Sequence, residues 1–336
     1  MRILLLAPSF FGYRDKVLGE LSRQGHDVDV LDDRPTESVA FKSLAKVGYQ
    51  LVDFRIAAYA KQVRRKAAAS KYDLFLYMGG MSFCFTREQF LSVREASGAR
   101  FVAYLWDSFS NCQRFGSCRD LFDEVYSFEP SDCNEFGLRL RPLFYSDAYS
   151  AIPRVPEDGF AYDACFIGSV HQPSKFKAVR CMCGELERMG RRVFTYFYMP
   201  SKSAAALRRC TDPAFRSANF QFKPLTAVQV SDVYAHSKAV IDSPQAGQGG
   251  LTMRTVETVG SRRKLITANS DVVNYDFAWH GDVAVWDKDC GIPGDLFERP
   301  YTELPSDVYD SYSISAFART LIGEGESFSG YERGNR

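Results

Sequence analysis

A glycine-rich segment near residue 250 has the composition of an anion-binding loop. It reads Gln-Gly-Gly-Leu-Thr-Met-Arg-Thr-Val-Glu over residues 248–257, and a helical pattern begins inside it. The backbone amides of consecutive glycines and the amino end of a helix both favour a bound phosphate. A threonine hydroxyl and an arginine suited to a diphosphate follow them. The segment therefore predicts a phosphate-binding site formed by Gly249, Gly250, Leu251, Thr252 and Arg254.

Glu257 lies three residues after Arg254, on the same face of the expected helix. A carboxylate at this place can accept hydrogen bonds from both hydroxyls of a ribose. The competing interpretation is an ion pair between Arg254 and Glu257 on a solvated helix face, worth only about 0.2–0.5 kcal/mol.

Two other strand ends in the same half of the chain are candidates for donor binding. One strand ends in Gly168-Ser169 and leads to His171 before a helix, so its backbone and hydroxyl could contact a phosphate. A tight turn with an exposed histidine explains the same pattern. The other strand closes with Lys223, Pro224 and Leu225, which could hold a base through backbone groups or form a simple strand-to-helix turn.

The first half of the chain offers an acceptor side. Asp107 follows an apolar run and is the best candidate for a base that deprotonates an acceptor hydroxyl, although it could instead cap the next turn. Glu129, after the next strand, is a weaker alternative. The loop after the first strand lacks the GxGxxG pattern of a dinucleotide-binding oxidoreductase. Its residues Phe11, Gly12 and Tyr13 are expected to face an acceptor.

The elements that must position these residues alternate between strand and helix, twice along the chain. Apolar runs separated by amphipathic helices predict parallel sheets covered on both faces. Such sheets bind ligands beyond the carboxyl ends of their strands, where the candidates lie. The expected strands are 3–7, 28–31, 72–78, 101–106, 124–128 and 139–144, then 162–167, 192–198, 219–223, 239–242, 264–267 and 283–286.

A proline-containing segment, residues 146–161, looks like a linker between the two halves. We therefore expect an α/β protein of two Rossmann-like, doubly wound domains facing a cleft. The first domain would span residues 1–150 and the second residues 151–323. A helix near 313–322 would close the chain, and residues 324–336 would form a polar tail.

Composition excludes several classes of protein. The 336 residues carry 42 basic and 41 acidic side chains, so a net charge of +1 gives no reason to expect nucleic-acid binding. The longest apolar runs are far shorter than a membrane-spanning helix. Nine cysteines without metal-ligand spacing suggest reduced thiols in a cytoplasmic protein. No HExxH or Walker motif occurs, and we expect no metal and no cofactor.

A basic stretch in the first half could contact an anionic membrane. Between Lys42 and Lys71 there are eight basic residues and one acid, Asp53, with aromatic and aliphatic residues interleaved. Such a segment, expected to be helical over 38–70, can rest on the inner face of a bacterial membrane. A solvated helix face is the competing interpretation.

At these motifs the chain resembles the CgeB-like and the capsule or exopolysaccharide glycosyltransferases of bacteria. The likeness extends to about Phe317, and its most specific motif is 250–258; the others are 3–13, 104–108, 128–133 and 166–169. The resemblance implies a GT-B fold, a donor in the C-terminal domain and an acceptor at the N-terminal domain. It also places Arg254 at the donor diphosphate and Glu257 at the ribose.

One departure limits what the resemblance implies. Common retaining GT-B enzymes carry a second glutamate eight residues before the ribose-binding one, and here that position is Gly249. The stereochemistry therefore does not follow. The expected function is metal-independent transfer of a sugar from a nucleotide-sugar to a saccharide or lipid-linked saccharide, in surface polysaccharide synthesis such as capsule or lipopolysaccharide. A nucleotide-sugar epimerase of the same fold and a non-catalytic nucleotide-sugar-binding protein are the alternatives.

Overall fold

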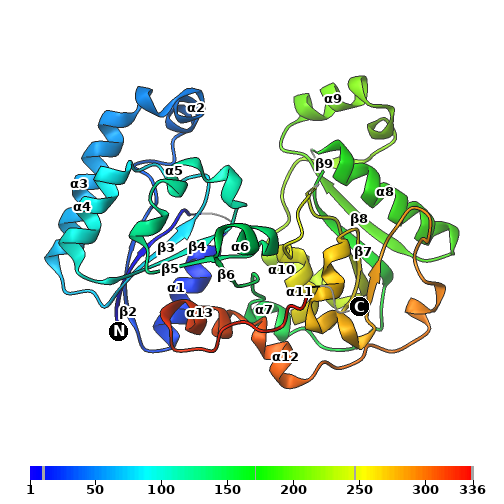
Figure 1. The fold of residues 1–336 in the computed structure, drawn as a ribbon. Helices are drawn as coiled ribbons and strands as arrows, with labels where there is room; N and C mark the ends of the chain where they lie inside the picture. Colours follow the sequence, from blue (N-terminus) through cyan, green and yellow to red (C-terminus); the bar gives the residue numbers. More distant parts are fainter. Residues whose placement is uncertain (10–11, 171, 246, 334–336) are drawn as a thin grey trace. The chain divides into compact units, whose positions relative to one another are not determined.

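The structure is a computed structural model that describes residues 1–9, 12–170, 172–245 and 247–333 (Figure 1). The chain forms two compact units. The first contains Met1–Pro142 and Ile314–Phe328, and the second contains Leu143–Ser313 and the chain from Ser329 onward. The chain therefore passes between the units three times.

The first unit is built on a six-stranded parallel sheet in the order β2-β1-β3-β4-β5-β6. All six strands expected from the sequence are present. The last is shorter than expected, because Pro142 has no backbone N–H for a sheet ladder. The strands are β1 (Arg2–Leu6), β2 (Asp27–Leu31), β3 (Leu74–Gly79), β4 (Arg100–Leu105), β5 (Glu124–Ser127) and β6 (Arg139–Leu140).

Helices flank this sheet. The expected continuous helix over 38–70 is divided, because α2 ends at Gly48 and a 3₁₀ turn separates it from α3. Thr86 and Gln89 form the capping box that starts α4. The helices are α1 (Tyr13–Arg23), α2 (Val39–Val47), α3 (Asp53–Ala69), α4 (Arg87–Ser97), α5 (Gln113–Gly116), α6 (Pro130–Phe136) and α13 (Ile314–Ile322), with 3₁₀ turns η1 (Tyr49–Leu51), η2 (Phe109–Asn111) and η3 (Arg119–Leu121).

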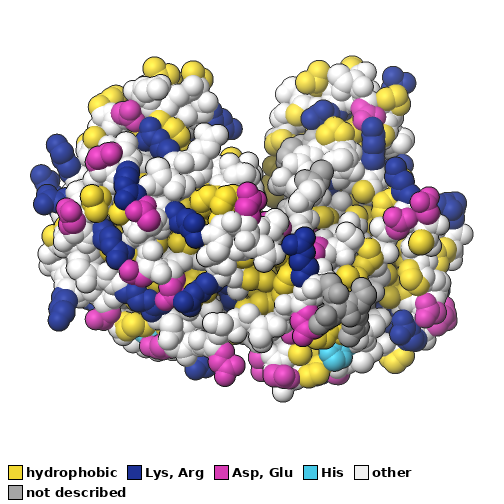
Figure 2. Space-filling view, viewed as in Figure 1, with side chains coloured by type: hydrophobic (Ala, Val, Ile, Leu, Met, Phe, Trp, Pro, Cys, Tyr) yellow, Lys and Arg dark blue, Asp and Glu magenta, His cyan; other side chains and the backbone are white. Residues whose placement is uncertain are grey.

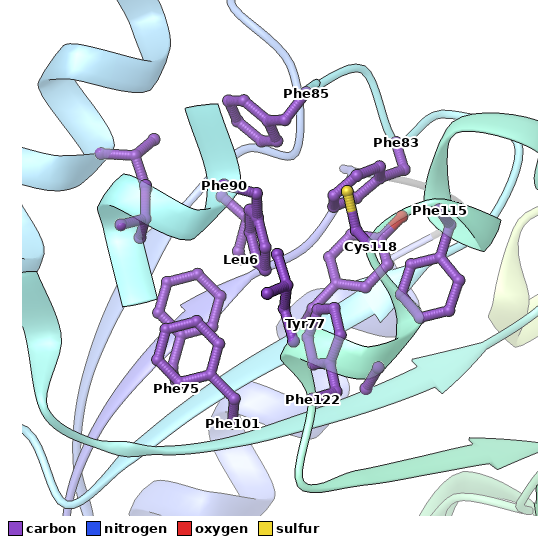
Figure 3. Packing of buried hydrophobic residues seen from close by; sticks show 14 of the residues in the cluster. Leu6, Phe75, Tyr77, Phe83, Phe85, Phe90, Phe101, Phe115, Cys118 and Phe122 are labelled. Carbon is purple, nitrogen blue, oxygen red and sulfur yellow. The ribbon is translucent and has the colours of Figure 1, made fainter. Parts of the chain in front are cut away.

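An aromatic cluster fills the core of the first unit (Figure 3). Phe75 and Phe101, on neighbouring strands, stack with ring centroids 4.4 Å apart. Phe90 of α4 meets Phe101 edge-on at 5.8 Å. Aromatic pairs add to the stabilisation from buried area. The cluster therefore packs α4 against β3 and β4, near the amino ends of these two strands.

The closing helix α13 packs on the first unit, although the sequence was expected to place residues up to 323 in the second domain. The Phe317 ring lies 4.7 Å from that of Tyr104 on β4, and the Arg141 guanidinium lies 5.6 Å from the Phe317 ring. The backbone of α13 also accepts a hydrogen bond from Arg100, through Ile322 O at 3.1 Å. The apolar stripe of α13 thus finds its partners in the first unit.

The second unit carries another six-stranded parallel sheet, in the order β12-β11-β10-β7-β8-β9. All six expected strands are again present, with helices in the connections between them, as in a doubly wound Rossmann-like sheet. They are β7 (Tyr162–Ser169), β8 (Val193–Tyr198), β9 (Phe220–Gln221), β10 (Ser237–Asp242), β11 (Lys264–Thr267) and β12 (Val283–Val285).

The helices of the second unit alternate with these strands. They are α7 (Asp147–Ser150), α8 (Pro173–Arg188), α9 (Lys202–Thr211), α10 (Ala227–Ala235), α11 (Met253–Gly260) and α12 (Ser306–Ser311), with 3₁₀ turns η4 (Pro213–Phe215), η5 (Ser270–Asn274), η6 (Asp276–His280) and η7 (Gly294–Phe297). The expected linker contains α7, and its Pro153 carbonyl accepts a hydrogen bond from the buried Arg263, at 2.7 Å.

The described part of the expected polar tail makes defined contacts with the second unit. Asp276 N donates to Gly330 O at 3.0 Å. The Tyr331 ring meets Tyr275 edge-on, with centroids 4.9 Å apart. The described residues from Ser329 onward are therefore part of the second unit's structure.

Gly260, at the end of α11, offers a test of this packing. A Cβ added there would collide with the ring and Cβ of Tyr145, so Gly260→Ala should lower the free energy of unfolding by about 1–3 kcal/mol. Gly184, inside α8, has open space around it, so Gly184→Ala should raise stability by about 0.5–1 kcal/mol. Denaturant unfolding followed by circular dichroism compares the two. Equal stability of both variants would contradict the packing described.

Candidate functional site

The carboxyl edge of the second sheet is where this fold places a ligand. Strands β7 and β10 are neighbours, and their connections leave in opposite directions along the sheet. Rossmann-like sheets bind ligands beyond the strand ends at this kind of switch point. Gly168 lies near the end of β7, and Asp242 is the last residue of β10.

Arg254 joins three elements at this edge. From the first turn of α11, its Nη1 donates to Oδ1 of Asp242 at 2.6 Å. Its Nε and Nη2 donate to the carbonyl oxygen of Ile167, at 3.1 and 2.7 Å. Burial opposes the charged form, but the neighbouring carboxylate prevails and raises the pKa of Arg254. Arg254 thus ties α11 to the ends of β7 and β10.

The carboxylate of Asp242 is fully buried and has partners on both oxygens. Its Oδ2 accepts from the hydroxyl of Thr255 at 3.1 Å, while Oδ1 accepts from Arg254. Sequence reasoning missed Asp242, since the final residue of a buried strand gave no separate signal. Asp242 and Arg254 are twelve residues apart in the sequence, and the fold brings their side chains together.

The structure gives a different reason for a glycine at position 168 than the predicted phosphate contact. A Cβ there would collide with Nη2 of Arg254. The space over Gly168 is therefore filled by the guanidinium. Thr252, predicted to offer its hydroxyl to a phosphate, caps α11 by accepting from Thr255 N at 3.2 Å.

A pocket of about 390 Å³ lies at this edge of the second unit, beside the glycine-rich loop. Its size is in the range of small-molecule sites. It is lined by the amino end of α8, the loop after β10 and the loop after β11. The lining residues include Ser174, Lys175, Gln245, Gly247, Gln248, Gly249, Asn269 and Asp271. Of the predicted phosphate residues, Gly249 is among them.

Lys175, in the first turn of α8, is the positive charge of this pocket, and sequence reasoning missed it. Burial and then the nearby charge of Arg254 lower the pKa of Lys175 to about 8, against an opposing effect of Asp242. Within the described residues its ammonium group has no hydrogen bond or ion pair. A half-buried lysine in this state favours an anionic ligand. In the sequence it looked like any lysine of an amphipathic helix.

The walls of the pocket are fastened to each other. Asn269 Nδ2 donates to Gly249 O at 3.0 Å, and Gln248 Nε2 donates to Gly250 O at 2.9 Å. Asp271 Oδ1 accepts from Asn274 Nδ2 at 2.8 Å and from the Tyr331 hydroxyl at 3.3 Å. The glycine loop and the loop after β11 therefore form one connected wall.

The other predicted donor residues that the structure describes are not in the lining of this pocket. Glu257 is half-buried on α11, and its charge raises the pKa of the buried Tyr234, after the larger effect of burial. Leu251 is buried, and Ser169 is half-buried at the end of β7. Lys223 and Pro224 are exposed, and Leu225 is half-buried, in the turn before α10. His171 lies outside the described residues.

Asp107 also has a local partner in the first unit. Its Oδ2 accepts from Met81 N at 3.1 Å, and a Cβ at Gly80 would collide with it. This contact joins Asp107 to the loop after β3 and not to the following turn, where the capping interpretation expected it, and Asp107 is half-buried after β4. Glu129 is buried and accepts from the Ser131 hydroxyl at 3.1 Å.

The loop after β1 is described only in part. Gly12 has a φ of +71° and begins α1, a backbone conformation that favours glycine. The Tyr13 ring lies 6.4 Å from that of Trp106, which precedes Asp107. Phe11 lies outside the described residues.

Among the described residues, no cluster of three or more His, Cys, Asp or Glu side chains could hold a metal ion. In the same residues, no helix is long and apolar enough to cross a membrane.

The buried pair of Arg254 and Asp242 can be tested by a double-mutant cycle. Arg254→Met leaves a buried carboxylate without its counter-charge and should cost about 3–5 kcal/mol in the free energy of unfolding. Adding Asp242→Asn should recover part of this loss, since the uncompensated charge is removed. The exposed Arg188 of α8 supplies a control, and Arg188→Met should change stability by less than about 0.5 kcal/mol. If Arg254→Met unfolds at the same denaturant concentration as the wild type, the pair is not structural.

Comparisons with known proteins find similar structures. No family model matches the chain, and no curated protein matches it in sequence. The lipopolysaccharide outer core galactosyltransferase WaaB superposes with a TM-score of 0.50 at 12% identity, covering 97% of this chain and 92% of that one. The catalytic domain of starch synthase IV from Arabidopsis thaliana, bound to ADP and acarbose, gives 0.55 at 10% identity, covering 96% and 98%.

A third similar structure is a putative UDP-N-acetylglucosamine 2-epimerase from Listeria monocytogenes. It gives a TM-score of 0.52 at 11% identity, covering 98% of this chain and 99% of that one. At such low identity these similarities establish the fold alone. The chain therefore has the α/β, two-domain Rossmann-like architecture of the GT-B class, which confirms the expected fold class.

Proposed function

We propose that the chain is a glycosyltransferase that binds the phosphates of a nucleotide-sugar in the pocket beside Lys175. One observation carries this proposal. A half-buried lysine, the amino end of a long helix and a glycine-containing loop line a single pocket at the switch-point edge of a Rossmann-like sheet. Each of these features favours an anion, and together they suit a diphosphate. Two of the similar structures are named with such ligands, the putative UDP-N-acetylglucosamine 2-epimerase and the starch synthase bound to ADP. Their names support a nucleoside diphosphate as the ligand of this pocket.

The chemistry follows from where charge develops. When the glycosidic bond to phosphate breaks, negative charge grows on the leaving diphosphate. The ammonium group of Lys175 and the amides of the glycine loop would stabilise it in a site partly screened from water. A well-placed group of this kind contributes about 2–4 kcal/mol to transition-state stabilisation. We propose that this charge neutralisation allows transfer of the sugar to proceed without a metal ion.

Arg254 has a positioning role in this proposal. Its pairing with Asp242 and its two bonds to Ile167 O hold α11, and hence the glycine loop, against the strand ends. Direct contact of Arg254 with a diphosphate, and of Glu257 with a ribose, remain predictions from the sequence.

We propose that the first unit binds the acceptor. Asp107 is half-buried at the carboxyl edge of that sheet, and the loop that contains Gly12 follows β1 at the same edge. We propose that Asp107 accepts the proton of an acceptor hydroxyl. We propose a saccharide acceptor in surface polysaccharide synthesis, such as lipopolysaccharide or capsule, and the name of WaaB, a lipopolysaccharide outer core galactosyltransferase, supports the first of these.

A nucleotide-sugar epimerase is the second candidate, because the Listeria protein shares the fold over nearly the whole chain. An epimerase would change a nucleotide-sugar without any acceptor. Incubating the protein with the donor alone and analysing the product by NMR separates the two activities. Formation of an epimer without an acceptor would replace transfer as the proposed function.

Lys175→Met tests the donor site. The wild type is first screened for thermal stabilisation by UDP, ADP, GDP, dTDP and CMP, since a ligand that prefers the folded state raises its stability. Lys175→Met should then weaken binding of the selected nucleotide and lower donor turnover by about 100-fold. Calorimetry and a transfer assay measure the two effects.

Lys177 gives the matched control on the same helix. It is exposed and pairs with Asp212 at 2.9 Å, away from the pocket lining. Lys177→Met should leave nucleotide affinity unchanged. Equal affinity of the Lys175→Met and Lys177→Met variants would rule out the proposed phosphate contact.

Nucleotide affinity should also depend on pH. Lys175 is charged in the free protein only below a pKa of about 8, and a bound phosphate would raise that pKa. Above about pH 8, the complex therefore holds more protons than the free protein, and nucleotide affinity should fall as the pH rises. Just below pH 8, Lys175 is charged in both states and the affinity should be constant. The decrease should approach about tenfold per pH unit. The Lys175→Met variant should show no such slope, and a wild-type affinity constant up to about pH 10 would contradict the assignment.

A further inference from the structure

Large apolar side chains are exposed together at one end of the first unit. Val39 and Val47 of α2 are 80% and 81% exposed, and Phe54 at the start of α3 is 71% exposed. Leu44 and Leu51 are 44% and 52% exposed. These five residues fall within sixteen positions of the chain. We define them as the α2–α3 patch.

The patch exists because α2 and α3 bury a different set of residues. Phe41, Val52 and Ile56 point into the core. On α3, Phe54, Lys61 and Arg65 are separated by seven and four residues, so they share the outward stripe of the helix. The apolar content noted in the sequence is thus divided between the core and the solvent.

The surroundings of the patch are basic. Five cations on α2 and α3 have no ion pair among the residues that the structure describes: Lys46, Arg55, Lys61, Arg64 and Arg65. The single acid of this segment, Asp53, is paired with Arg114. Glu37, just before α2, is paired with Lys42 and Arg34. The positive charge around the patch is therefore not neutralised locally.

Figure 1 shows where the helices that carry these residues lie, and Figure 2 shows the side chains on the surface there. α2 and the start of α3 lie at the end of the first unit opposite the amino terminus, and apolar side chains are visible there on the surface. A single-sided apolar face rimmed by lysine and arginine is the composition of a helix that lies in a lipid interface. Protein interfaces, in contrast, are depleted in lysine.

We propose that the α2–α3 patch binds the surface of an anionic lipid bilayer. Val39, Val47 and Phe54 would enter the boundary between headgroups and acyl chains, while Lys61 and Arg65 contact anionic headgroups. Each basic residue near such a surface strengthens binding about fivefold at low salt. This proposal stands on exposure and charge and does not depend on the chemistry of the pocket.

The test uses the full-length protein and co-sedimentation with vesicles. One set is phosphatidylcholine alone, and the other contains about one-third phosphatidylglycerol. The wild type should sediment with the anionic vesicles, weakly with the neutral ones, and less as salt is raised. The combined change Val47→Ser and Phe54→Ser should weaken anionic-vesicle binding about tenfold, and Lys61→Glu with Arg65→Glu at least about tenfold.

Matched controls come from the second unit. Val228 and Leu207 are 77% and 64% exposed, similar to Val47 and Phe54. The combined change Val228→Ser and Leu207→Ser should leave vesicle binding unchanged. All of these side chains are exposed, so circular dichroism and thermal unfolding should show that every variant is folded.

Three outcomes would overturn the proposal. The wild type could fail to bind anionic vesicles, or the variant that combines Val47→Ser with Phe54→Ser could bind as well as the wild type. Sedimentation velocity could instead show a dimer that the same two substitutions dissociate without affecting vesicle binding, which would make a second copy the occupant. Nucleotide stabilisation, measured on the same variants, should be unchanged, so this result is independent of the proposed donor site.

Discussion

The buried ion pair between Arg254 and Asp242 is the constraint on which the edge of the second sheet depends. Taking both charges out of water is costly, and the cost is offset only while each keeps its partners. Asp242 has Arg254 and Thr255, and Arg254 also has the Ile167 carbonyl. The end of β10 and the start of α11 are therefore held together. The glycine-rich loop between them is attached to β10 at one end and to α11 at the other. Because both ends are held in place, the positions open to its backbone amides are limited.

Lys175 and Arg254 are neighbouring cations with opposite functions. Arg254 is neutralised by a carboxylate inside the fold, while Lys175 faces the pocket without a partner among the described residues. Burial, and after it the charge of Arg254, disfavour the charged form of Lys175 and lower its pKa. An anion entering the pocket would relieve this repulsion. This arrangement supports the proposed anion site.

Sequence reasoning predicted the fold and a glycine-rich segment beside the candidate pocket, but not the contacts of Arg254 or the place of Lys175. Strand and helix periodicity depends on local pattern, so twelve strands were found in the right places. The importance of Arg254 was also visible, because an arginine beside glycines at a helix start is a local signal. Its partner Asp242 and the role of Lys175 depend on which strand ends meet in space. The same holds for α13, whose apolar stripe could have packed on either sheet.

The path of the chain explains why neither unit is a contiguous piece of sequence. After α13, which belongs to the first unit, the chain returns to the second at Ser329. There Tyr331 packs on Tyr275 and donates to Asp271, in the wall of the pocket. Glu332 N also donates to Asn274 O at 2.9 Å, in the same turn. The last described residues thus support the loop that faces Lys175. Residues that the sequence predicted only as a polar tail are, by these contacts, part of the pocket's framework.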